Sequence, residues 1–131
     1  GVVQAVALAL FVNKEKHQKY RNALKTLEDK TDAEAFTALK KEFPPVDVAD
    51  FVDHIDYIKN KIGIDHVGIS SDFDGGGGVE GWKDASETFN VTLELVKRGY
   101  TEEEISKIWS GNLLRVLDET AKIASELQKA K

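Results

Sequence analysis

The stretch from residue 66 to residue 78 constrains the fold of this chain more than any other. Residues 66–71 read His-Val-Gly-Ile-Ser-Ser, and their β-branched side chains predict a short buried strand. Two carboxylates, Asp72 and Asp74, follow this strand at once. Four glycines, residues 75–78, then end regular structure, because glycine loses the most conformational freedom in a helix or strand. The sequence therefore predicts a strand that delivers acidic side chains to a glycine-rich loop.

The end of this predicted strand is a candidate functional site. Active sites of α/β proteins are built at the carboxyl ends of their strands. Asp72 and Asp74 would concentrate negative charge there, where a metal, a proton transfer or a substrate ammonium group could use it. Alternatively, an isolated D-x-D-G sequence forms a simple polar turn that is closed by an Asx-type hydrogen bond and has no catalytic role.

The order of the predicted elements indicates an α/β fold. A second apolar run, Val2 to Phe11, carries hydrophobic side chains on both faces and predicts a central strand of a parallel sheet. Residues 14–45 predict two helices that form an excursion from the core. Asp47 is the expected N-cap of a third helix with an apolar face, which ends at Gly63.

Capping residues predict further helix boundaries. Asp32 predicts the start of the second excursion helix, and Ser86 predicts the start of a helix after the glycine loop. Thr101, followed three residues later by glutamate, is a capping-box sequence that predicts another helix through Trp109. A break at Ser110–Gly111 then predicts a separate, amphipathic last helix.

The predicted strands are too few for a complete domain. Two strands leave unpaired edges and uncovered apolar faces, so they do not form a stable sheet by themselves. The chain of 131 residues also contains no methionine. We therefore expect it to be the carboxyl-terminal part of a larger protein, with the remaining strands supplied from elsewhere.

Composition excludes several classes of function. The formal net charge of −5 argues against nucleic acid as a partner, because phosphate contacts need clustered Lys and Arg. The chain has no cysteine, which excludes disulfides and thiolate metal sites. His17, His54 and His66 lack the spacing of a zinc motif, so we expect no metal ligands within this chain.

D-x-D-G sequences also occur in two other kinds of site, and the residues that follow Asp72 exclude the first of them, the EF-hand. An EF-hand would need a side-chain oxygen at its fifth position and a glutamate at its twelfth, where this chain has Gly76 and Lys83. Haloacid-dehalogenase-type phosphotransferases also place such a sequence after an apolar strand, with the first Asp as nucleophile. Those enzymes need further strand-borne Lys and Asp residues, whereas the sequence after the glycine loop is helical throughout. The phosphohydrolase stays an alternative.

Several blocks of sequence together resemble the carboxyl-terminal portion of the membrane (renal) dipeptidase family, peptidase family M19. The resemblance runs through most of the chain outside residues 14–45. Its blocks are Gly1-Val2-Val3-Gln4, Asp53-His54-Ile55-Asp56-Tyr57-Ile58, residues 63–75, Lys97-Arg98-Gly99-Tyr100-Thr101-Glu102-Glu103 and Gly111-Asn112-Leu113-Leu114-Arg115-Val116.

This resemblance implies a fold, a reaction and a cofactor. The fold would be a TIM barrel of about 250 residues. Val2 to Phe11 would then be its seventh strand and residues 66–71 its eighth, and the rest of the barrel would be the necessary partner segment. In the family, two zinc ions hold a hydroxide that attacks the peptide bond of a dipeptide. The zinc ligands would lie upstream of Gly1, and a homodimer is among the expected assemblies.

The resemblance also assigns roles to individual residues. Asp72 would be the catalytic acid of the last strand, which holds the substrate amino group and transfers a proton to the leaving nitrogen. Asp74 and Gly75 would shape the substrate-binding loop, with Asp74 accepting backbone N–H bonds. The sequence as a whole leaves three hypotheses for the function of the chain. It is part of a zinc dipeptidase, a phosphohydrolase, or a non-catalytic remnant of a barrel.

Overall fold

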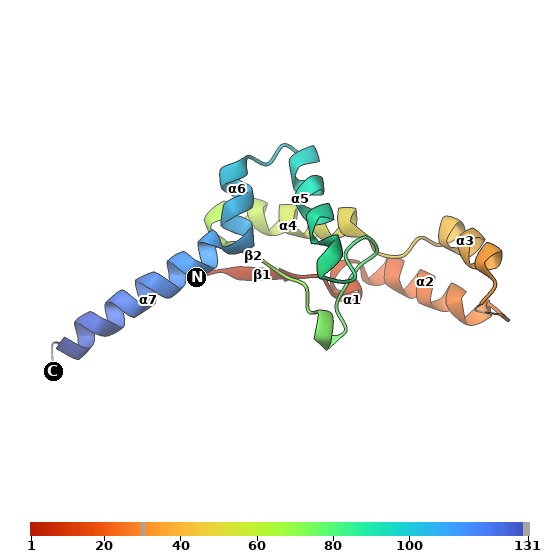
Figure 1. The fold of residues 1–131 in the computed structure, drawn as a ribbon, viewed down its shortest axis with the longest axis horizontal. Coiled ribbons are helices and arrows are strands. Elements are labelled where there is room, and N and C mark those ends of the chain that lie inside the picture. The colour runs from red at the N-terminus through yellow and green to blue at the C-terminus, as the bar shows by residue number, and fades with distance from the viewer. Residues whose placement is uncertain (30, 130–131) are drawn as a thin grey trace.

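The computed structural model describes residues 1–29 and 31–129 (Figure 1). Its helices and strands are β1 (Val3–Val6), α1 (Ala9–Val12), α2 (Lys14–Thr26), α3 (Ala33–Glu42), α4 (Val48–Ile62), β2 (Val67–Ser70), α5 (Thr88–Lys97), α6 (Glu102–Ser106) and α7 (Asn112–Lys129). Short 3₁₀ turns lie at Ile64–His66, Phe73–Gly75 and Ala85–Glu87, and a π-helical segment, Lys107–Gly111, joins α6 to α7. The described part is a mostly helical α/β structure, as the order of elements predicted.

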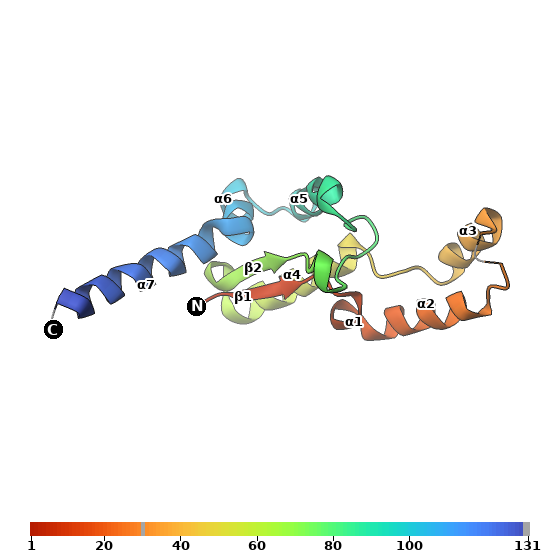
Figure 2. The ribbon, with the colours of Figure 1, turned by 60° about the horizontal axis from the view of Figure 1, so that its bottom comes forward.

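The two strands form a parallel pair with α4 packed along them. Val3 pairs with Val67 at one end of the pair and Val6 with Ser70 at the other. Figure 2 shows the strands side by side, and α4 contacts both. The side chain of Phe51 on α4 is fully buried in this core. Both strands therefore point their carboxyl ends in the same direction, toward the predicted site.

The predicted strand from Val2 to Phe11 is wrong in length and in burial. β1 ends at Val6, and the chain then turns into α1. The Ala7 N–H still bonds to the Ser70 carbonyl (2.9 Å), but β2 ends there, so the following residues have no strand to pair with. An apolar run cannot by itself distinguish a strand from a helical turn. Val3 is 51% exposed and Gln4 is also exposed, whereas Ala5 is fully buried, so β1 does not have the two-sided burial of a central strand.

Most predicted caps are confirmed. The Asp32 carboxylate accepts N–H bonds at the start of α3. Asp47 and Asp50 form a capping box at the start of α4, and Thr101 forms another at the start of α6. Gly63 ends α4 with a φ of 86°, a conformation that favours glycine. These signals depend only on neighbouring residues, so a single sequence can carry them.

Two predicted boundaries are wrong. Ser86 is not the N-cap, because the Asp84 carboxylate accepts the Ser86 N–H and begins a 3₁₀ turn that leads into α5. Ser110–Gly111 does not break the helix either. The π-helical segment carries the backbone from α6 into α7, and the residues on either side of it, Ser106 and Asn112, have helical φ angles of −59° and −66°.

Asn112 connects α7 to the strand below it. Its side chain is 2% exposed, and its amide donates to the carbonyls of Ile64 (2.7 Å) and Val67 (2.8 Å). Asn112→Ala would leave a buried carbonyl without a donor, which costs about 1–3 kcal/mol of unfolding free energy. Urea denaturation measures this loss. The exposed Asn60→Ala on α4 is the control, expected within about 0.5 kcal/mol of wild type. Equal stability of both variants would contradict the assignment.

The helices at either end extend away from the sheet. α2 and α3 project on one side and α7 on the other, in both Figure 1 and Figure 2. Large apolar side chains of α7 are exposed, namely Leu113, Leu114, Leu117, Ile123 and Leu127. Within the described residues, no helix combines the length and apolarity needed to cross a membrane.

Candidate functional site

The carboxyl edge of the strand pair brings two loops together. β1 continues into α1 and the helices beyond it, and β2 continues into the loop that carries Asp72. The Gly78 N–H donates to the Ala7 carbonyl (2.7 Å), which ties the end of the glycine loop to the end of β1. The predicted position of Asp72 at a strand mouth therefore matches the structure.

Asp72 adopts an unusual backbone conformation. Its φ is 55° and its ψ is 32°, and among the described residues it is the one non-glycine residue with positive φ. Its carbonyl accepts the N–H groups of Gly75 (3.0 Å) and Gly77 (2.7 Å). Aspartate tolerates this region better than most residues, but the conformation still costs free energy. Such strain concentrates at functional sites, because the surrounding structure must hold the residue in place.

Two glycines make room for the Asp72 side chain. A Cβ on Gly75 would overlap the Asp72 carboxylate, and a Cβ on Gly77 would overlap the Ser71 carbonyl and the Asp72 Cβ. The turn can close against Asp72 only because these positions lack side chains. Gly75 therefore lies in direct contact with the proposed catalytic acid, in the 3₁₀ turn Phe73–Gly75.

The side chain of Asp74 differs from that of Asp72 in its exposure to solvent. Asp72 is half-buried, whereas Asp74 is exposed. None of the hydrogen bonds among the described residues involves the Asp74 carboxylate, so the backbone N–H bonds expected of it are not formed within this part of the chain. Its carboxylate faces solvent two residues from Asp72.

An aromatic cluster anchors the loop. The Phe73 ring meets Trp82 edge-on, with 5.5 Å between ring centroids. Trp82 is 2% exposed and packs between Phe51 (5.4 Å) and Trp109 (6.0 Å). Its indole N–H donates to the Thr88 hydroxyl (3.2 Å). Trp82 is thus a core residue that fixes the residue next to Asp72, and its ring is not free to stack on a ligand.

The described residues do not form a zinc site. His66 lies at the amino end of β2, with its Nδ1 2.8 Å from the Gly1 carbonyl, so it is far along the strand from Asp72. Across residues 1–29 and 31–129, no group of three or more His, Asp or Glu side chains is placed to hold a metal ion. The side chains present therefore do not fit the metal pair that the family resemblance implies.

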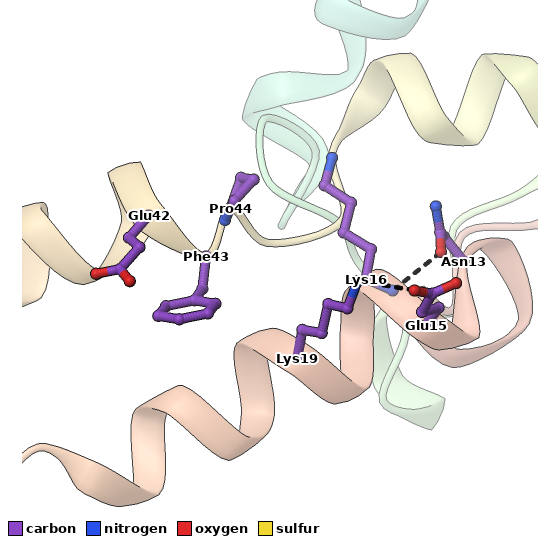
Figure 3. Close-up of a pocket in the computed structure, with 7 residues that line it drawn as sticks. All are labelled: Asn13, Glu15, Lys16, Lys19, Glu42, Phe43 and Pro44. Atoms are coloured by element: carbon purple, nitrogen blue, oxygen red, sulfur yellow. Dashed lines mark hydrogen bonds and ion pairs between the residues drawn. The ribbon is translucent and has the colours of Figure 1, made fainter.

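The lysines that line a cavity near the start of α2 are both engaged in ion pairs within the chain. The cavity has a volume of about 270 Å³ and lies between α2 and the end of α3 (Figure 3). Lys16 binds Asp47 (3.0 Å) and Asp50 (2.5 Å), and Lys19 binds Glu15 (2.7 Å). Hydrogen bonds from Lys16 hold the pKa of the Asp50 carboxyl below its ordinary value, although burial alone would raise it. We assign no ligand to this cavity.

One network of charges was not anticipated from the sequence. Arg98, at the end of α5, binds Asp56 (2.7 Å), Asp53 and Glu94 (3.0 Å). The Tyr100 hydroxyl also donates to Asp56, and burial together with this bond raises the pKa of the phenol well above its ordinary value. Apart from Glu94, these residues come from two of the sequence blocks that resemble the family, residues 53–58 and 97–103. The presence of both blocks in the sequence is the signal that could have pointed to a contact between α4 and the end of α5.

Taken together, the parallel strands and the strained acid at their carboxyl edge define an α/β protein with a strand-end acidic site. A family model described as "Membrane dipeptidase (Peptidase family M19)" matches residues 1–131. The chain belongs to this family.

Individual relatives agree with this assignment. Dipeptidase tcpJ of Claviceps purpurea is 40% identical over 79 residues, which are 60% of this chain and 19% of that protein. Human Dipeptidase 3 is 38% identical over 81 residues, which are 60% of this chain and 16% of that protein. The crystal structure of the probable dipeptidase PvdM from Pseudomonas aeruginosa superposes with a TM-score of 0.64 at 37% identity. That match covers 88% of this chain and 36% of PvdM, so the chain spans only a minor part of each relative.

Proposed function

We propose that this chain forms part of the active site of a dipeptidase. The observation that carries the proposal is Asp72, a half-buried acid held in a left-handed conformation at the carboxyl edge of two parallel strands. Family membership and the similarity to proteins named as dipeptidases support this choice of reaction. Because the chain matches only a minor part of the length of those proteins, we propose that it supplies some of the residues of a larger active site.

The role proposed for Asp72 is to bind the peptide amino group and to move a proton. A carboxylate forms a strong charge-assisted hydrogen bond with an ammonium group. Once it has taken up a proton from the attacking water, the same carboxyl group can give that proton to the leaving nitrogen when it lies within hydrogen-bond distance. Gly75 supports the carboxylate by contact, and the exposed Asp74 is proposed to line the substrate side of the loop.

The strand pair is proposed to be the last two strands of a TIM barrel. In the described residues the sheet has two strands, which leaves both of its outer edges unpaired, and the apolar side chains of α7 are also exposed. Further barrel strands would cover these surfaces. The two zinc ions that the family resemblance implies would be held by side chains outside residues 1–131.

Dipeptide hydrolysis by the whole protein tests this function. The protein that contains these residues should release free amino acids from a dipeptide such as Ala-Ala. A chelator should abolish the release, and added zinc should restore it. A magnesium-dependent phosphatase assay on a simple phosphate ester tests the alternative that uses Asp72 as a nucleophile. Phosphate release without dipeptide hydrolysis, or no activity at all, would contradict the proposal.

Gly75→Ala should impair catalysis through Asp72. The new methyl group would overlap the Asp72 carboxylate, so one of the two must move. Misplacement of a catalytic group by about 1 Å can cost up to about 100-fold in rate, and we expect kcat to fall by about 10- to 100-fold. Gly1→Ala is the control, because nothing lies within 4 Å of its added methyl group. Unchanged kcat in Gly75→Ala would contradict the proposed contact.

A further inference from the structure

A second cavity lies between the excursion helices and the glycine loop. Its volume is about 340 Å³, and it is lined from one side by α2 and α3 and from the other by residues 78–80 and 83. Gly78, in its wall, is the residue whose N–H bonds to Ala7 at the end of β1. Gly77 bonds to the Asp72 carbonyl. The cavity therefore adjoins the loop that holds Asp72, on the same edge of the sheet.

The charges that line this cavity are mostly positive. Arg21, Lys40 and Lys83 line it together with one carboxylate, that of Glu80. Lys40 and Lys83 each lie 2.8 Å from a Glu80 oxygen. Although burial alone would raise the pKa of the Glu80 carboxyl, its hydrogen bonds with the two lysines hold it below the ordinary value. The cavity thus carries excess positive charge in a chain whose formal net charge is −5.

Arg21 is the cation of this cavity that is left to bind a ligand. It is exposed on α2, and none of the ion pairs among the described residues includes it. Guanidinium groups suit carboxylates, because their N–H groups match the two oxygens. The walls beside Arg21 include the apolar side chains of Leu24, Phe36 and Val79. A short aliphatic chain that ends in a carboxylate matches this combination of apolar wall and cation.

We propose that this cavity is a specificity pocket in which Arg21 binds the acidic side chain of a peptide's second residue. The proposal rests on the proposed dipeptidase function, in which Asp72 holds the amino end of the same peptide. The second residue would then extend from the strand edge across the glycine loop toward α2. The preferred substrates would be dipeptides that end in glutamate or aspartate.

The test compares two substrates that differ only in the charge of one side chain. Ala-Glu and Ala-Gln are given to the whole protein, as wild type and as Arg21→Gln. We expect Arg21→Gln to raise the KM for Ala-Glu by about fivefold and to leave kcat unchanged. A fivefold change in affinity is about the largest that the loss of one exposed ion pair causes. The KM for Ala-Gln should stay the same. Lys14→Gln removes a positive charge from the same helix outside the cavity and should change neither KM.

Equal KM changes for both substrates, or changes below about twofold, would overturn the inference. Binding of Ala-Glu, measured by calorimetry on chelator-treated wild type and Arg21→Gln, gives a readout that does not need turnover. If wild type hydrolyses neither dipeptide, the proposed function fails. Weaker Ala-Glu binding by Arg21→Gln would still support the pocket, and equal binding by both proteins would overturn it.

Discussion

Replacing Asp72 with asparagine is expected to lower kcat for dipeptide hydrolysis by about 10²- to 10⁴-fold, the usual contribution of a positioned general acid or base. The amide cannot carry the negative charge that an ammonium group needs, and it cannot donate a carboxylic proton. Asparagine also accepts the left-handed conformation found at this position, with φ at 55°. The fold should therefore survive the substitution, and the loss should be chemical.

Steady-state kinetics and an unfolding curve separate these two effects. Asp118→Asn on α7 removes the same charge from an exposed position and is the matched control. It should leave both kcat and stability unchanged. Retention of kcat within about tenfold in Asp72→Asn, with normal stability, would show that Asp72 is not the catalytic acid.

Trp82→Ala is expected to lower the free energy of unfolding by about 3–5 kcal/mol. The indole is 2% exposed and packs against Phe51, Phe73 and Trp109, so its removal leaves a large cavity in the core. The hydroxyl of Thr88 would also lose its donor. Because Phe73 neighbours Asp72 in sequence, the variant should lose activity even at temperatures where it stays folded.

Chemical denaturation, with activity measured well below the transition, checks both parts of this expectation. The control is Tyr57→Ala on α4, which removes an aromatic ring that is 61% exposed and should change stability by about 0.5 kcal/mol or less. A loss below about 1 kcal/mol in Trp82→Ala would contradict the view that this residue anchors the loop.

Local signals predicted most of the helix starts and the loop that follows β2. Asp32, Asp47 and Thr101 act within three residues of the helix starts that they cap, and the apolar face of α4 follows from its own periodicity. The strand end before Asp72 was predictable because the following glycines exclude regular structure. These features need no knowledge of distant residues.

Features that depend on distant partners were not predictable in the same way. The length of β1 depends on where β2 ends, since Ala7 makes the last hydrogen bond to Ser70. The burial of Asn112 depends on carbonyls more than forty residues away, at Ile64 and Val67. The left-handed conformation of Asp72 follows from contacts with Gly75 and Gly77, which only the folded turn brings together.

A crystal structure of the whole protein with a non-hydrolysable dipeptide analogue bound would test the role of Asp72 most directly. We expect the amino nitrogen of the analogue within about 2.6–3.2 Å of the Asp72 carboxylate, at the carboxyl edge of β1 and β2. An analogue bound elsewhere, or one bound at this edge with Asp72 turned away toward solvent, would contradict it.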